Sequence, residues 1–236
     1  MSKQPIINVV IPAQNEEKAI GKVIGAIPDI VTRIIVADNG STDNTAKVAQ
    51  EAGAEIISVP IAGYGRACMG GIKAAKPCDI IVFLDGDASD YPEELTRLVQ
   101  PIIDGDVEMV IGSRILGKRE KGSLTMVQSF GNRLACSLMK LFWGATYTDL
   151  GPFRAIKAEA LERLNMQAPT FGWTVEMQVR ALKYGLSYME VPVSYRNRIG
   201  RSKISGTVRG VILAGFYILG TIFYELLFNR VKIDKT

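Results

Sequence analysis

The chain has 236 residues, of which 47% are hydrophobic and 22% are charged, and its formal net charge is +4. This length can bury the core of one α/β domain with a tail, and the composition argues against a disordered chain or an array of short repeats. A charge of +4 is too small to indicate a nucleic-acid partner, but it suits an anionic substrate or a membrane surface.

Two residue types limit the chemistry and the compartment. The sequence contains no histidine, which excludes Ser/His and Cys/His nucleophile pairs and the commonest zinc ligand. Its three cysteines, Cys68, Cys78 and Cys136, form no CxxC pair, so neither a disulfide framework nor a structural zinc site is indicated. The segment from Met1 to Asn8 lacks the apolar core of a signal peptide. We therefore expect a cytoplasmic protein whose acid-base chemistry depends on carboxylates or on the substrate.

The first part of the chain alternates apolar, β-branched runs with helix-like stretches. This pattern is typical of a parallel sheet covered by helices, and continuously apolar strands indicate that both faces are covered. The expected strands are Ile6 to Ile11, Ile34 to Ala37, Glu55 to Val59, Ile80 to Leu84 and Met109 to Ile111. The expected helices are Glu17 to Ala26, Asn44 to Ala52, Arg66 to Ala75 and Pro92 to Ile103.

Past Ile111 the alternation stops, and the sequence reads as an elaboration of the same domain. The expected elements are a polar loop from Gly112 to Gly122, a helix from Val127 to Trp143, a turn from Asp149 to Pro152, a helix from Trp173 to Tyr184, a strand from Ser187 to Val193 and a basic loop from Arg196 to Gly206. We expect a catalytic domain over residues 1–206, with a nucleotide-sugar-binding half at 1–114 and an acceptor-side half at 115–206. Residues 207–236 would form an apolar helix and tail.

This last helix, from about Thr207 to Phe228, contains an uncharged apolar run from Gly210 to Tyr224. The run is shorter than the ~20 residues that span a bilayer. One alternative is a helix packed on the domain or on a second copy of the chain. The other is a helix in a membrane interface, which suits its aromatic residues and basic flanks. The aromatic residues are Phe216, Tyr217, Phe223, Tyr224 and Phe228.

Polar residues follow the expected strands at four places. Ligands of open parallel sheets bind outside the carboxyl ends of the strands, so we expect these residues to line one rim. The four segments are Pro12-Ala13-Gln14-Asn15-Glu16-Glu17, Asp38-Asn39-Gly40-Ser41-Thr42-Asp43, Asp85-Gly86-Asp87 and Gly112-Ser113-Arg114.

The acidic turn Asp85-Gly86-Asp87 is the most informative of these segments. Carboxylates two residues apart in an extended segment point to the same side, and Gly86 allows the backbone a close approach. Two such oxygen ligands suit Mg²⁺ or Mn²⁺ whose coordination is completed by phosphates and water. An isolated motif of this kind is more often an ordinary turn or a helix cap. Its position after an apolar strand, with three companion segments, favours the metal site.

Two further positions have a functional and a structural alternative. Asp38 can accept a hydrogen bond from the imino N–H of uracil or guanine, or it can belong to a helix cap. The turn from Gly63 to Ala67 opens a helix, where backbone N–H groups around Gly65 and the side chain of Arg66 can meet a pyrophosphate. A glycine-rich turn of this length is also a common loop.

Most of the chain resembles the family 2 glycosyltransferases. The segments that carry the resemblance are Ile6 to Asp90, Gly112 to Arg114, Asp149 to Arg154 and the loop Arg198 to Lys203. The resemblance is to the branch that transfers a hexose to dolichyl or polyprenyl phosphate. It implies a GT-A type fold, that is, a Rossmann-like, mostly parallel sheet with helices on both faces. It also implies inverting, metal-dependent transfer from a UDP- or GDP-sugar.

The resemblance implies roles for individual residues. Pro12, Asn15, Glu17 and Asp38 would bind the nucleoside. Asp85 and Asp87 would bind the metal on the diphosphate. Arg114, Arg133 and Ser137 would face the acceptor phosphate. Arg201 and Lys203 would close over the phosphates. The sequence departs from the family pattern at Asn39, where a second aspartate is common, and at Ser89, where a glutamine is common.

Arg198 belongs to the same basic loop as Arg201 and Lys203. Because Gly200 and Gly206 allow this loop to close on a substrate, we interpret it as a phosphate clamp. The alternative is a solvated basic loop.

The acceptor decides whether a general base is needed. A lipid monophosphate, whose second pKa lies near ~6, is already anionic at neutral pH. A sugar hydroxyl or another small soluble acceptor instead needs a carboxylate, for which Asp149 and Glu176 are the candidates, unless they are a turn-stabilising acid and a paired helix charge. A third hypothesis is a nucleotide-binding scaffold without turnover. We expect a peripheral protein on the cytoplasmic face of the membrane, with a homo-oligomer as an open alternative.

Overall fold

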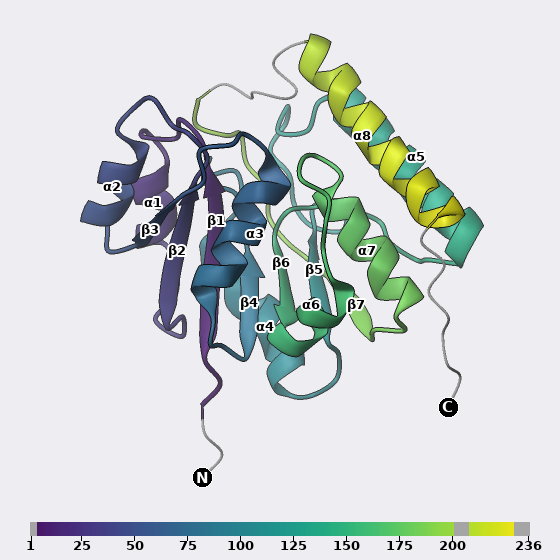
Figure 1. The fold of residues 1–236 in the computed structure, drawn as a ribbon, viewed down its shortest axis with the longest axis horizontal. Helices are drawn as coiled ribbons and strands as arrows, with labels where there is room; N and C mark the ends of the chain where they lie inside the picture. The colour runs from purple at the N-terminus through teal and green to yellow at the C-terminus, as the bar shows by residue number, and fades with distance from the viewer. Residues whose placement is uncertain (1–3, 201–207, 229–236) are drawn as a thin grey trace.

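A seven-stranded mixed sheet organises residues 4–200 and 208–228, the part of the chain that the computed structural model describes (Figure 1). The strands are β1 (Ile7–Ala13), β2 (Arg33–Asp38), β3 (Glu55–Ser58), β4 (Ile80–Phe83), β5 (Met109–Ser113), β6 (Arg154–Lys157) and β7 (Tyr188–Pro192). Their order in the sheet is β3-β2-β1-β4-β6-β5-β7. All neighbours are parallel except β6, which is antiparallel to both β4 and β5.

Helices cover both faces of the sheet. They are α1 (Ile20–Gly25), α2 (Thr45–Glu51), α3 (Tyr64–Ala75), α4 (Leu95–Ile103) after a short 3-10 turn η1 (Pro92–Glu94), α5 (Met126–Trp143), α6 (Ala158–Leu164), α7 (Trp173–Lys183) and α8 (Val208–Leu227). The core on one face joins the sheet to α1, α2 and α4, and the core on the other joins it to α3, α5, α6 and α7. Every residue of β1, β4 and β5 is buried, as the continuous apolar runs predict. The predicted α/β fold is confirmed.

The sequence analysis missed β6 and α6. It expected only a turn near residue 150, because Arg154–Lys157 is short and has a cation at each end. Arg154 is nevertheless 1% exposed, since its guanidinium donates to the carbonyls of Leu150, Gly151 and Thr174. Backbone carbonyls thus provide the pairing that a buried guanidinium requires.

Local signals define α5. The hydroxyl of Thr125 accepts from the backbone N–H of Gln128, whose side chain accepts in return from the N–H of Thr125. Gly144 ends the helix with a φ of 71°, a left-handed conformation that glycine adopts without strain.

The C-terminal helix α8 packs on α5 and α7 (Figure 1). Ile222 and Glu225 are buried in this contact, whereas Ile212 and Phe216 on α8, and Phe228 just after it, are exposed. None of the helices within residues 4–200 and 208–228 has the length and hydropathy that crossing a bilayer requires. The tail helix therefore has an inner face that belongs to the domain and an outer apolar face.

Helix α3 approaches β1 closely at Gly71. A Cβ atom built on this residue would overlap Cγ1 of Val10, which lies in the fully buried β1. The small residue is therefore required by the contact between helix and sheet.

Gly71→Ala is expected to lower the free energy of unfolding by about 1–3 kcal/mol, because the added methyl group forces α3 away from the sheet. Urea denaturation measures the change. Gly131→Ala is the matched control in α5, where no atom lies within 4 Å of the added Cβ. That substitution should leave stability unchanged or raise it by up to about 1 kcal/mol through helix propensity. Equal stability of wild type and Gly71→Ala would contradict the close packing.

Candidate active site

The acidic turn lies directly after β4, at the carboxyl end of the parallel strands. The Tyr64 hydroxyl donates to Oδ1 of Asp85 at 3.1 Å. The backbone N–H and the hydroxyl of Ser89 donate to Oδ1 of Asp87, at 2.9 and 2.5 Å. Gly86 packs against α1, where an added Cβ would lie 3.2 Å from Cδ1 of Ile20. The turn is therefore held in one conformation, and Ser89 orients the carboxylate of Asp87 through two hydrogen bonds.

Negative charge is concentrated at this turn. Burial and the neighbouring Asp87 raise the pKa of Asp85 to about 7. Burial, with Asp85 and Asp87 nearby, raises the pKa of Asp90 well above its ordinary value. Oδ1 of Asp90 is buried and has no hydrogen-bond partner among the described residues. A cation placed here would relieve both the repulsion and the missing contact.

The donor set fits a divalent cation that is only partly held by protein. Within residues 4–200 and 208–228, no three acidic or cysteine side chains are arranged to hold a metal by themselves. Asp85 and Asp87 can supply two oxygens, and a Mg²⁺ or Mn²⁺ ion commonly takes the remainder from substrate phosphates and water.

A basic segment packs on the acidic turn. Nη2 of Arg198 lies 3.1 Å from Oδ2 of Asp87 and 3.2 Å from Oε1 of Glu16. The N–H of Ile199 donates to the carbonyl of Asp87 at 2.9 Å, and the Arg196 guanidinium lies 4.4 Å from the centre of the Tyr91 ring. Arg198, predicted as part of a phosphate clamp, thus lies against the acidic turn. Arg201 and Lys203 lie outside the described residues.

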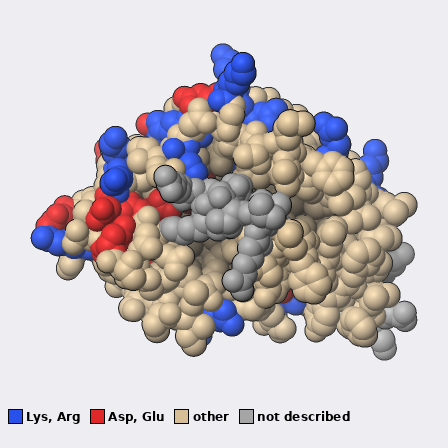
Figure 2. All heavy atoms as spheres, turned by 90° about the horizontal axis from the view of Figure 1, so that it is seen from above, with Lys and Arg blue, Asp and Glu red and all other residues tan. Residues whose placement is uncertain are grey.

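Figure 2 shows the surface seen from above, at the upper end of the sheet. Acidic and basic residues gather on one side of this face, and the side where α5 and α8 lie is mostly uncharged (Figures 1 and 2). The molecule therefore offers a charged region and a mostly uncharged region next to each other.

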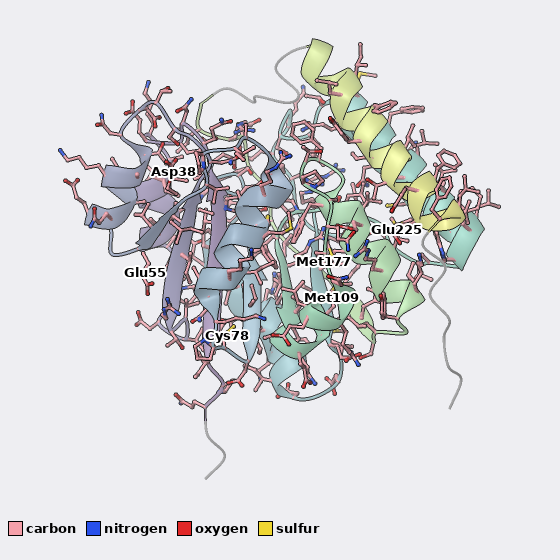
Figure 3. The ribbon with its side chains drawn as sticks, viewed as in Figure 1. Asp38, Glu55, Cys78, Met109, Met177 and Glu225 are labelled. Atoms are coloured by element: carbon pink, nitrogen blue, oxygen red, sulfur yellow. The ribbon has the colours of Figure 1, made fainter. Side chains whose placement is uncertain are left out.

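The residues predicted to hold a nucleoside come together beside the charged turn. Asn15 adopts a left-handed φ of 53°, and its Oδ1 accepts from the N–H of Thr42 at 2.7 Å. Glu17 accepts from the N–H of Asn44 at 3.1 Å. Asp38 ends β2 at the upper edge of the sheet and accepts from the N–H of Ser41 (Figure 3). Asn15, Glu17 and Asp38 thus shape the turn before α2, while the remaining predicted residue, Pro12, is buried in β1.

Asn39 connects this turn to the next one along the rim, which the sequence analysis did not foresee. Its Nδ2 donates to the carbonyls of Val59 and Ile61 at 2.8 and 3.0 Å. Its Oδ1 accepts from the N–H of Gly63 at 2.7 Å. The available signal was its position directly after β2, where polar side chains face the ligand rim.

The Gly63 to Arg66 turn opens α3, but its groups are already engaged. The N–H of Arg66 donates to the carbonyl of Pro169 at 3.1 Å, and its side chain donates to the carbonyl of Ala62 at 2.8 Å. Carbonyls of residues 168 and 169 occupy the space beside Gly63 and Gly65. This arrangement argues against the predicted pyrophosphate contacts of Gly65 and Arg66.

Arg114 and Asp149 form a buried ion pair on the acceptor side. Nε and Nη2 of Arg114 donate to the two oxygens of Asp149 at 2.8 and 2.7 Å, and the backbone N–H of Arg114 donates at 2.8 Å. Asp149 is 0% exposed, and the Tyr195 ring lies 5.0 Å from the guanidinium. Because both its oxygens accept from Arg114, the geometry argues against Asp149 as a general base.

Glu176 is also buried and engaged. It accepts from the backbone N–H groups of Gln167 and Ala168 at 3.1 and 2.7 Å and lies 2.9 Å from Nη2 of Arg180. This placement argues against the predicted role of Glu176 as a base. Arg133 and Ser137 are exposed one turn apart on α5, which places them on one side of that helix.

Comparison with known proteins identifies the family. Residues 8–164 match glycosyl transferase family 2. The chain belongs to this family. A relative from Mycobacterium tuberculosis, described as an uncharacterised glycosyltransferase, is 35% identical over 211 residues, which cover 88% of this chain and 94% of the relative. The predicted family and the predicted enzyme class, a glycosyltransferase, are both confirmed.

Two family relatives have names that include an acceptor. The UDP-N-acetylglucosamine–dolichyl-phosphate N-acetylglucosaminyltransferase of Methanococcus voltae is 32% identical over 213 residues, covering 80% of this chain and 84% of the relative. The undecaprenyl-phosphate mannosyltransferase of Micrococcus luteus is 28% identical over 216 residues, covering 85% and 88%.

Solved structures confirm the predicted GT-A type fold. Glucosyl-3-phosphoglycerate synthase from Mycobacterium tuberculosis, in complex with Mn²⁺, UDP and glucosyl-3-phosphoglycerate, superimposes with a TM-score of 0.75 at 25% identity. The match covers 94% of this glycosyltransferase and 80% of the synthase.

The buried ion pair predicts how Asp149→Asn will behave. The amide leaves the Arg114 guanidinium without a counter-charge, so stability should fall by about 3 kcal/mol and kcat should fall at every pH alike. Urea denaturation and a pH–rate profile measure the two effects. Glu55→Gln, which breaks the exposed pair with Arg33, should cost at most about 1 kcal/mol. Selective loss of the acidic limb of the profile in Asp149→Asn would instead identify Asp149 as the base.

Proposed function

We propose that this glycosyltransferase moves a hexose from a nucleoside-diphosphate sugar to a polyprenyl phosphate, with inversion at the anomeric carbon. The observation that carries the proposal is the buried acidic turn, with Arg198 against it and the Asp38 turn beside it. This combination offers a cation site, a phosphate-binding cation and a nucleobase acceptor on one rim.

The donor would bind across that rim. Asp85 and Asp87 would hold Mg²⁺ or Mn²⁺, as the Mn²⁺ and UDP in the similar synthase suggest for this fold. Bound there, the metal would neutralise charge that develops on the departing diphosphate. Arg198 already lies 3.1 Å from Asp87, so it would reach a phosphate on the same ion. Asp38 would accept from the N–H of uracil or guanine.

The acceptor side favours a substrate that is already charged. Asp149 and Glu176 are engaged with Arg114 and Arg180, and neither carboxylate is placed to take a proton from a hydroxyl. A lipid monophosphate needs no such base, because it is anionic at neutral pH. The names of the dolichyl- and undecaprenyl-phosphate transferases support the same acceptor class.

An apolar surface supports a lipid acceptor held in a membrane. Helices α5 and α8 lie side by side (Figure 1). Both expose large apolar side chains, which commonly mark interaction surfaces. We call this set the α5/α8 apolar face: Met126, Val127, Phe130, Leu141, Ile212, Phe216, Phe223, Tyr224, Leu227 and Phe228. Aromatic and aliphatic side chains of this kind suit the boundary between headgroups and acyl chains.

A soluble phosphorylated acceptor is the second candidate. It is favoured by the likeness to glucosyl-3-phosphoglycerate synthase, which was also solved with UDP-glucose, Mn²⁺ and phosphoglyceric acid. The engaged carboxylates fit such an acceptor only where its phosphate oxygen is the nucleophile, because transfer to one of its hydroxyl groups would still require a base.

Asp87→Ala should lower transfer by at least ~10³-fold while the fold is retained, because the cation loses a ligand where the leaving group departs. The assay supplies labelled UDP- and GDP-sugars, Mn²⁺ and polyprenyl phosphate, and counts label in the organic phase. Asp29→Ala, in a loop that precedes β2, is the control and should be fully active. An undiminished rate in Asp87→Ala would overturn the metal assignment, and label found only in water-soluble product would favour the second candidate.

Phe130→Glu combined with Phe216→Glu should reduce co-sedimentation with anionic phospholipid vesicles by at least roughly tenfold, because each carboxylate opposes insertion of the α5/α8 apolar face. Ile30→Glu also places a charge at an exposed apolar residue, but outside this face, and should bind vesicles like wild type. A wild type that does not sediment with vesicles, but elutes as a dimer that the double substitution disrupts, would replace the membrane with a second copy of the chain.

A further inference from the structure

A buried group of four charges connects α8 to α7. Nε of Arg180 lies 2.9 Å from Oε1 of Glu225, and Nζ of Lys183 lies 2.7 Å from Oε2 of Glu225. Arg180 also pairs with Glu176 at 2.9 Å. The side chains of all four residues are at most 9% exposed, and Figure 3 places Glu225 on the side of α8 that faces α7. Since an unpaired charge is costly at such a site, the four side chains fix one another's positions.

The same group holds a short piece of chain that we call the strap, Gln167–Pro169. Glu176 accepts the backbone N–H groups of Gln167 and Ala168. Arg180 donates to the carbonyl of Leu164, just before the strap, at 3.0 Å. A cavity of about 400 Å³ separates the strap from the apolar side chains of α8. On this side the strap is therefore held by hydrogen bonds to Glu176 and not by close packing.

The other side of the strap presses on the start of α3. The carbonyl of Pro169 accepts from the N–H of Arg66, and the carbonyls of Ala168 and Pro169 fill the space where Gly65 and Gly63 lack a Cβ. Tyr64, between those two glycines, donates its hydroxyl to Asp85 at 3.1 Å. A displacement of the strap would therefore move the side chain that orients Asp85.

We infer that Glu225 is a positioning residue for the donor site: through Arg180, Glu176 and the strap, α8 sets the place of Tyr64 and Asp85. The inference rests on the proposed function only in assigning Asp85 to the metal and diphosphate of the donor. It also gives α8 two roles, because the helix that contributes to the α5/α8 apolar face holds the donor site through its buried Glu225.

The test is Glu225→Gln, which removes the charge that holds Arg180 and Lys183. The Kd for UDP and for GDP, each with Mn²⁺, is measured by calorimetry at a temperature where circular dichroism shows the variant folded. We expect Kd for the nucleotide that wild type binds to rise roughly tenfold, about 1.4 kcal/mol. Ile222→Ala is the matched control, since it removes buried packing one turn away on α8 without touching the four charges. It should lower thermal stability but leave Kd unchanged.

A double-mutant cycle locates the path. Tyr64→Phe removes the last link to Asp85, so the double variant Tyr64→Phe/Glu225→Gln should raise Kd, relative to wild type, by clearly less than the product of the two single-variant effects. Unchanged affinity in Glu225→Gln, an equal loss in Ile222→Ala, or independent effects in the cycle would each overturn the inference. If Glu225→Gln does not fold, Glu225→Asp, which keeps the charge but shortens its reach to Arg180, takes its place with the same expectations. A wild type that binds neither nucleotide with Mn²⁺ would instead refute the proposed function.

Discussion

The structure depends on negative charge held out of water at the end of β4. Burial and the neighbouring Asp87 raise the pKa of Asp85, and burial with Asp85 and Asp87 nearby raises the pKa of Asp90. A protein keeps such a group only where surrounding bonds force the geometry. Here Ser89 holds Asp87, Tyr64 holds Asp85, and Arg198 lies across the turn. Ser89 is adjacent to the turn in sequence, whereas Tyr64 and Arg198 come from distant segments that the fold brings to it.

Much of this arrangement could be predicted from the sequence because it depends on periodicity and on position after a strand. The apolar runs that became β1, β4 and β5 are buried on both faces, and such runs are readable without a structure. The rim residues follow from the same reading, since parallel strands deliver their carboxyl ends to one edge. Strand β6 was not predictable in this way, because Arg154 is buried only through carbonyls that the folded chain brings to it.

The roles of side chains were less predictable than their positions, because the sequence does not show whether a carboxylate binds a substrate or pairs with an arginine. Asp149 and Glu176 illustrate this. Both lie near the expected site, yet each meets a guanidinium and backbone N–H groups that only tertiary contacts reveal. Asn39 shows the converse, as a departure from the family pattern that bonds to three backbone groups of the following segment. The position of a residue after a strand thus indicated that it lies at the rim. Its hydrogen bonds and ion pairs in the folded chain determine what chemistry it can perform.

The engaged carboxylates have a consequence for the chemistry. The chain has no histidine, and Asp149 and Glu176 are engaged with Arg114 and Arg180, so neither of the two predicted bases is placed to take a proton from a neutral hydroxyl. A phosphate acceptor removes that requirement, because its nucleophilic oxygen is already ionised. The protein's task is then to hold two anionic phosphates near each other, which a cation at the acidic turn and nearby arginines can do. Both proposals for α8 agree with this chemistry, because its exposed apolar side chains would suit a lipid and its buried Glu225 would hold the donor site in place.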